Sequence, residues 1–136
     1  MAKNKGVSKP YNSGQWTAAR MRSFISSALR AATRRWGPKH EALKKACVGK
    51  KLNAATGKEI YHYKCAGCGK LFKGAEVAVD HIEPVVDPDV GFKGWDTYIT
   101  RMFCEVDGFQ VLCNTCHSIK TANEKKRRME RKYEDC

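Results

Sequence analysis

Four of the seven cysteines form two closely spaced pairs. Cys65-x2-Cys68 and Cys113-x2-Cys116 are separated by 44 residues. A two-residue gap lets two thiolates converge on one ion from a tight turn, and two such pairs complete the tetrahedral thiolate shell that structural zinc prefers. A single pair of this spacing also arises by chance or as a redox pair. Because four thiolates leave no open coordination position, we expect a structural zinc ion.

The other three cysteines give no sign of a second site. Cys47 is predicted on an apolar helix face and Cys104 follows Met-Phe, so both are interpreted as small core residues. Cys136 is terminal and uninformative. No apolar run exceeds three residues, so the sequence predicts neither a membrane span nor a signal peptide. We therefore expect a soluble cytoplasmic protein with reduced thiols rather than a disulfide framework.

A carboxylate and two imidazoles lie near the cysteine pairs. Asp80 and His81 stand in Val-Asp-His-Ile-Glu-Pro, and His117 directly follows Cys116. A neutral imidazole can take a proton from water at neutral pH. A carboxylate and an imidazole can together hold one hard divalent ion and leave positions open for phosphate and water. These are the groups that hydrolysis of a phosphodiester requires.

The arrangement resembles the HNH endonucleases and their ββα-metal fold. Asp80-His81 lies on a predicted strand, and Cys-x2-Cys-His opens a predicted helix. Similarity to small stand-alone HNH proteins of bacteriophages extends over 24–43, 95–104 and 110–121, within about 110 residues. The resemblance implies that His81 is the general base and that Asp80 and His117 hold a catalytic Mg²⁺, Mn²⁺ or other divalent ion. It also implies DNA as the substrate, with 5′-phosphate and 3′-hydroxyl products.

The chain departs from the family pattern at one position. The Asn that precedes the second cysteine pair in the family, and braces the loop carrying the base, falls here on Gly108. Asp107, Asn114 or a shortened loop are the candidate replacements. Successive strand residues also point to opposite faces, so Asp80 and His81 cannot both reach one site from an ideal strand. We therefore predict a bulge or a strand end there.

Simpler interpretations exist for the same residues. An isolated Asp-His pair is more often structural than catalytic, and a His after Cys-x2-Cys can be a spare zinc ligand or a surface residue. Lys120 fits a phosphate contact or plain solvent exposure. Ordinary loop or surface positions are expected for a further set: Glu83, Asp87, Asp89, His40 and His62.

The expected elements place these residues in a mixed fold. The predicted helices are 15–36, which Gly37-Pro38 ends, 38 to about 48, 95–103, and one from the N-cap Asn114 into 125–128. The predicted strands are 60–64 with 71–72, 77–82, and 109–113, and 49–58 and 83–94 are expected to be loops.

Charge is distributed unevenly along the chain. The sequence has 26 Lys+Arg against 14 Asp+Glu. Residues 1–58 carry 14 basic side chains and one acidic side chain, Glu41, whereas residues 59–112 carry five basic and nine acidic ones. Basic arms suit a polyanion and a local acidic cluster suits a cation, although a basic surface can also serve solubility alone.

The sequence as a whole predicts an α+β protein with a ββα-metal (HNH) core, a four-cysteine zinc site and an N-terminal basic helical region. Its predicted parts are a flexible basic tail (1–14), the helical region (15–58) and the nuclease domain (59–136). The expected location is the cytoplasm, that of the bacterial host if a phage encodes the protein. Alternatives are a zinc-finger module that binds nucleic acid without catalysis and a zinc-bound assembly module. DNA is the expected partner, no membrane is expected, and a homodimer or phage packaging proteins stay open.

Overall fold

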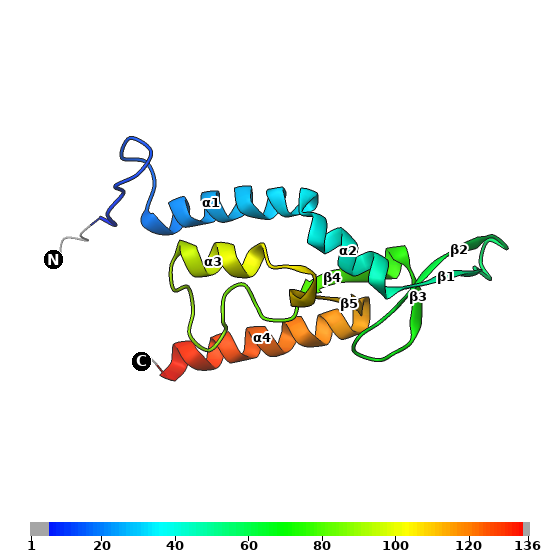
Figure 1. The fold of residues 1–136 in the computed structure, drawn as a ribbon. Helices are drawn as coiled ribbons and strands as arrows, with labels where there is room; N and C mark the ends of the chain where they lie inside the picture. The colour runs from blue at the N-terminus through cyan, green and yellow to red at the C-terminus, as the bar shows by residue number, and fades with distance from the viewer. Residues whose placement is uncertain (1–5, 135–136) are drawn as a thin grey trace. The chain divides into compact units, whose positions relative to one another are not determined.

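The described chain, residues 6–134 of a computed structural model, alternates helices with short strands (Figure 1). The helices are α1 (Ala18–Ala32), α2 (Gly37–Ala46), α3 (Trp95–Met102) and α4 (Asn114–Glu134). The strands are β1 (Cys47–Leu52), β2 (Glu59–Lys64), β3 (Leu71–Lys73), β4 (Val77–His81) and β5 (Phe109–Cys113). The predicted α+β class is therefore confirmed. Part of the predicted tail, and Cys136, lie outside the described residues.

Internal contacts divide the chain into an N-terminal unit ending at Arg35 and a C-terminal unit beginning at Trp36. In the N-terminal unit, Thr17 caps α1 by accepting a hydrogen bond from the Arg20 amide at 3.1 Å. The Arg20 guanidinium lies 5.2 Å from the centre of the Trp16 ring. A 3₁₀ turn, Thr33–Arg35, follows the helix, so α1 is shorter than the predicted 15–36. None of the helices described for either unit is long and apolar enough to cross a membrane.

The second predicted helix is too long. Helix α2 ends at Ala46, and residues 47–52, expected as helix end and loop, form strand β1. Cys47 has extended backbone angles, and Gly49, at φ +104°, allows the register shift between Cys47 and Gly49 that starts the strand. The interpretation of Cys47 as a helix-face residue is therefore wrong. The predicted helical region 15–58 also contains a strand.

Two antiparallel sheets make up the strand content of the C-terminal unit. One has the order β1-β2-β3, and its antiparallel β2–β3 pairing, with Tyr63 opposite Phe72, confirms the strands predicted at 60–64 and 71–72. The other pairs β4 with β5 in regular register, with Asp80 opposite Gln110 and His81 opposite Phe109. Strand β4 ends at His81, so the alternative of a strand end is confirmed and the bulge is absent from this pairing.

The β4–β5 pair is packed between two helices. Both α2 and α4 contact β4 and β5, and Figure 1 shows the two helices on different sides of the strands. Phe109, Val111 and Leu112 of β5 are buried. The chain order β4, β5, α4 gives two antiparallel strands followed by a helix that begins directly after β5. This arrangement brings the end of β4 against the first turns of α4.

Hydrogen bonds attach the connecting segments to this centre. The Trp36 indole Nε1 donates to the Cys104 carbonyl at 2.7 Å, which joins the start of α2 to the segment after α3. Arg101 of α3 donates to the Pro84 carbonyl at 3.0 Å. Asp89 is held by Arg127 of α4 through two hydrogen bonds. The loop that follows β4 is thus fixed by both α3 and α4.

Gly108, where the HNH pattern has Asn, lies in a crowded 3₁₀ turn, Val106–Gly108. A Cβ atom built on Gly108 would lie 2.5 Å from Cys104 Sγ and 2.9 Å from Cys104 Cβ. Both distances are shorter than real Cβ contacts, so a side chain here requires movement of the 104–108 segment. Cys104 is half-buried, and that burial raises the pKa of its thiol, in keeping with the predicted role of a small core residue.

Gly108→Ala should therefore lower the free energy of unfolding by about 1–3 kcal/mol. Cys104→Ala in the same chain removes Sγ and should restore part of the loss, as measured by urea denaturation of all four members of the cycle. Gly37→Ala is the matched control, because a Cβ there meets nothing within 4 Å. Additive effects of the two substitutions would contradict the proposed crowding.

Candidate metal centre and histidine site

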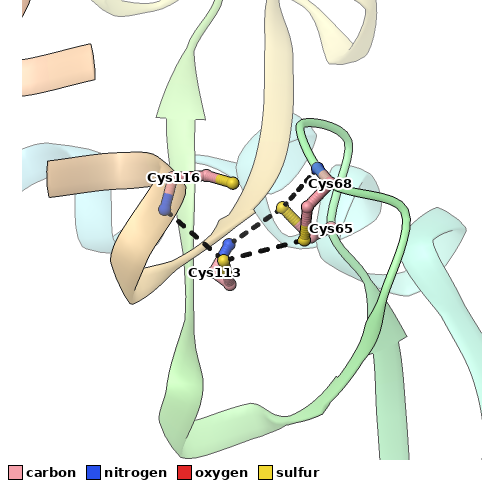
Figure 2. Close-up of side chains that lie close together, drawn as sticks. All are labelled: Cys65, Cys68, Cys113 and Cys116. Carbon is pink, nitrogen blue, oxygen red and sulfur yellow. Dashed lines mark hydrogen bonds between the residues drawn. The ribbon is translucent and has the colours of Figure 1, made fainter. Parts of the chain in front are cut away.

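The four cysteines of the two predicted pairs converge on one point. Figure 2 shows Cys65 and Cys68 on the turn after β2, facing Cys113 at the end of β5 and Cys116 at the start of α4. The four Sγ atoms all lie within 4.8 Å of one another, and Cys68 Sγ is 4.0 Å from Cys113 Sγ. This cluster could hold a metal ion.

Backbone amides surround the sulfur atoms. The amides of Gly67 and Cys113 each donate to Cys65 Sγ at 3.3 Å, and that of Cys68 does so at 3.5 Å. Burial raises the pKa of the Cys65 thiol, but these donors outweigh it and lower the pKa to about 6. Such donors are the usual surroundings of a thiolate that binds a metal.

Cys116 shows the opposite shift. Hydrogen bonds of the Cys116 thiol to the side chains of Cys113 and Cys65 raise its pKa to about 12. Full deprotonation of the cluster would bring four negative sulfur atoms together, which disfavours loss of the Cys116 proton. A bound cation removes that constraint by compensating the charge.

The turn after β2 is built for this convergence. A Cβ on Gly67 would lie 3.0 Å from Cys116 Sγ, so the absence of a side chain lets α4 approach the turn. Gly69, at φ +74°, closes the turn with its amide donating to the Cys65 carbonyl at 2.9 Å. The two Cys-x2-Cys segments are also joined by the Ala66 amide, which donates to the Val111 carbonyl at 2.8 Å.

The cluster fits a tetrahedral zinc ion. Zn–S bonds of about 2.3 Å in a tetrahedron place sulfur atoms about 3.8 Å apart. The observed 4.0 Å between Cys68 and Cys113 is close to that value. Two thiols are buried, one is half-buried and one is exposed, so an ion has a path to the site. The donor set is consistent with structural zinc.

A second cluster forms around Asp80 on the side of β4 that faces α4. Asp80 Oδ1 lies 3.8 Å from His117 Nε2, and Asp80 Oδ2 pairs with Lys120 Nζ. Gln110, opposite Asp80 in the sheet, donates to Oδ2 at 3.4 Å. The Asp80 side chain is 18% exposed and that of His117 is 42% exposed, so the pair is reachable from solvent. The fold thus brings Asp80 and His117 together.

His81 is held on a different side from Asp80. Its ring packs on Phe109, with ring centres 4.8 Å apart, and its Nε2 lies 2.8 Å from the Met102 carbonyl. A carbonyl only accepts, so Nε2 carries the proton in this hydrogen bond. In the neutral ring the lone pair is then on Nδ1. His81 is therefore oriented with Nδ1 as its basic nitrogen.

Lys120 makes more contacts than its sequence position indicates. Its Nζ bonds both the Asp80 carboxylate and the His81 carbonyl, and it lies 3.6 Å from Glu124. Of the two alternatives for Lys120, plain solvent exposure does not hold, since its side chain is 24% exposed and contacts Asp80. Helical spacing was the available signal, because positions 117, 120 and 124 share one face of a helix.

The C-terminal Lys/Arg run, residues 125–128, contains one cation that is paired within the protein. Arg127 holds the Asp89 carboxylate through two hydrogen bonds, so Asp89 is not an ordinary loop acid. The Arg127 hydrogen bonds lower the pKa of Asp89, and in turn Asp89 raises the pKa of Arg127. Lys125, Lys126 and Arg128 of the same run are exposed.

No family model matches the sequence, and no curated protein or solved structure matches it either.

The purified protein should contain about one zinc ion per chain, measured by atomic emission after exhaustive dialysis. Cys65→Ser or Cys113→Ser should lose that ion, because three thiolates bind zinc far more weakly than four. Cys47→Ser is the matched control and should keep the ion. Metal retained by both cluster variants would refute the site.

The affinity for zinc should fall as pH is lowered, because zinc displaces the Cys116 proton. It should fall more steeply below pH 6, the approximate pKa of Cys65.

Lys120→Met should lower the free energy of unfolding by about 1–2 kcal/mol, because it removes the ammonium donor shared by the half-buried Asp80 carboxylate and the His81 carbonyl. Thermal and urea denaturation measure the effect. Lys125→Met, an exposed lysine of the same helix, should change stability little. Equal stability of the two variants would show that the Lys120 contacts contribute nothing.

Proposed function

We propose that this protein is a metal-dependent HNH endonuclease that hydrolyses phosphodiester bonds of DNA, with a structural zinc ion in the four-cysteine cluster. The observation that carries the proposal is the pairing of Asp80 with His117, 3.8 Å apart, on the strand whose next residue is the oriented His81. The HNH pattern noted in the sequence assigns roles to these same three residues. In the proposal Asp80 and His117 hold the catalytic divalent ion.

His81 serves as the general base. Its Nε2 is occupied by the Met102 carbonyl, so Nδ1 is the nitrogen available to take a proton from water. The resulting hydroxide would attack phosphorus and the bond to the 3′ oxygen would break. The 3′ oxyanion would take up a proton from water, so the products would carry a 5′-phosphate and a 3′-hydroxyl. A divalent ion held by Asp80 and His117 would act as a Lewis acid on the scissile phosphate.

The missing family Asn is compensated by the backbone in this proposal. The Ile82 amide, directly after the base, donates to the Gly108 carbonyl at 2.9 Å. The Met102 carbonyl orients the base itself. Two main-chain acceptors, the Met102 carbonyl at the end of α3 and the Gly108 carbonyl just before β5, thus brace the end of β4. In this proposal the backbone supplies the brace for which Asp107, Asn114 and a shortened loop were the sequence-based candidates.

The cysteine cluster supports the same site through α4. Cys116 and His117 are consecutive, so their side chains leave the helix about 100° apart. One joins the cysteine cluster and the other lies against Asp80. A zinc ion that fixes Cys116 therefore also fixes the orientation of His117.

A non-catalytic DNA-binding module is the second candidate, and the Lys120 contact favours it. Its ammonium group already pairs with Asp80 Oδ2, an oxygen that a divalent ion would also attract. If that ion pair persists, Asp80 is a structural residue and the protein binds DNA without cutting it.

Supercoiled plasmid distinguishes the two candidates. Purified protein with Mg²⁺ or Mn²⁺ should nick or linearise the plasmid, and His81→Ala should slow the reaction by about 10²–10⁴-fold, the usual contribution of a general base. His40→Ala, an exposed histidine on α2, is the matched control and should cut at the rate of the unchanged protein. Asp80→Asn should abolish cleavage with either ion, because it removes a carboxylate ligand of the divalent ion.

Intact plasmid that nevertheless shifts on a gel would reject the endonuclease in favour of the binding module. Cleavage that survives His81→Ala would reject the assigned base.

A further inference from the structure

The three-stranded sheet β1-β2-β3 carries an unusually one-sided charge. Residues 47–73 contain six lysines and a single acidic residue, Glu59. The lysines are Lys50, Lys51, Lys58, Lys64, Lys70 and Lys73. All except Lys73 are exposed, and Lys73 lies 3.7 Å from Glu76. A cationic surface of this kind attracts a polyanion.

Large apolar side chains are exposed among these lysines. Leu52 is 65% exposed, Tyr61 is 55% exposed and Leu71 is 44% exposed. Lys50 Nζ lies 5.2 Å from the centre of the Tyr61 ring, a cation–π contact between opposite positions of β1 and β2. Apolar groups kept in water beside cations contribute little to folding, so their placement suggests a contact surface.

The pairing register puts lysines on both faces of the ribbon that β1 and β2 form. Lys50 pairs with Tyr61 on one face, and Lys51 pairs with Ile60 on the other. A surface that lies flat on a membrane has one apolar and one charged face. A ribbon charged on both faces instead suits a groove whose two walls are both anionic.

The dimensions agree with such a groove. Each of the two strands has six residues, about 20 Å in length, and the ribbon projects away from the helices of its unit (Figure 1). The major groove of DNA, about 12 Å wide, admits a two-stranded β-ribbon between its phosphate backbones. We infer that the β1–β2 ribbon is a DNA-contact surface that enters the major groove, with Lys50, Lys51 and Lys58 meeting phosphates. The inference rests on the proposed function for its choice of DNA.

Fluorescence anisotropy with a 30-base-pair duplex tests the inference on the full, zinc-loaded chain without added Mg²⁺ or Mn²⁺. The ribbon variant is Lys50→Gln/Lys51→Gln/Lys58→Gln. The control is Lys39→Gln/Lys44→Gln/Lys45→Gln, which removes the same charge from α2 of the same unit. Circular dichroism and zinc content verify that each variant is folded.

The slope of log affinity against log salt concentration measures the number of phosphate contacts, and loss of three contacts should reduce its magnitude by about 2.7. Between 50 and 200 mM KCl, the affinity of the unchanged protein should therefore fall about 40-fold more than that of the ribbon variant. The control should keep a slope closer to that of the unchanged protein. An unaltered slope in the ribbon variant, or equal losses in the two variants, would overturn the inference.

Two further measurements distinguish this inference from membrane binding and from the proposed endonuclease activity. Vesicles of phosphatidylserine and phosphatidylcholine should show no ribbon-dependent binding, and ribbon-dependent capture by vesicles with unchanged DNA affinity would overturn it. The plasmid assay reports on cleavage independently. If the ribbon variant loses DNA affinity but the unchanged protein never cuts plasmid, the ribbon inference stands and the endonuclease is rejected. If the protein cuts plasmid but the ribbon variant keeps the salt dependence of DNA binding, the endonuclease stands and the ribbon inference is rejected.

Discussion

Convergence of four thiols on one point is the interaction on which the C-terminal unit depends. The cluster joins the turn after β2 to the junction of β5 and α4, segments more than 40 residues apart in the chain. The cluster of buried residues beside it consists of Leu112 and the buried cysteines, with Phe72 and Cys116 packed against them. A bound ion would add to the folding free energy by joining these two segments.

Spacing of short motifs predicted the parts of this arrangement that are local or chemically demanding. Two Cys-x2-Cys pairs have few other uses when they occur together, and His117 next to Cys116 necessarily lies on another side of the same helical turn. Strand β1 was missed because Val48 to Leu52 is rich in lysine and glycine and gives no alternation signal. Its strand conformation comes from pairing with β2, which is a tertiary effect.

Contacts between distant segments account for what the sequence left open at the histidine site. The Met102 carbonyl orients His81 and the Gly108 carbonyl accepts from Ile82, but main-chain groups leave no mark in a residue pattern. Lys120 is different, since its identity and helical position were visible while its partner on β4 was not. Charge counts also treated the C-terminal cations as a uniform run, although Arg127 belongs to Asp89.

Use of adjacent residues by two sites restricts how this chain can change in length. One residue inserted between Cys116 and His117 would turn His117, Lys120 and the rest of α4 by about 100° relative to the cysteines. The cluster and the Asp80 contacts could not then both be satisfied. The exposed turn joining β1 to β2, residues 53–58, carries no such double constraint. Length variation in this protein is therefore tolerable at the tip of the ribbon and excluded from the first turns of α4.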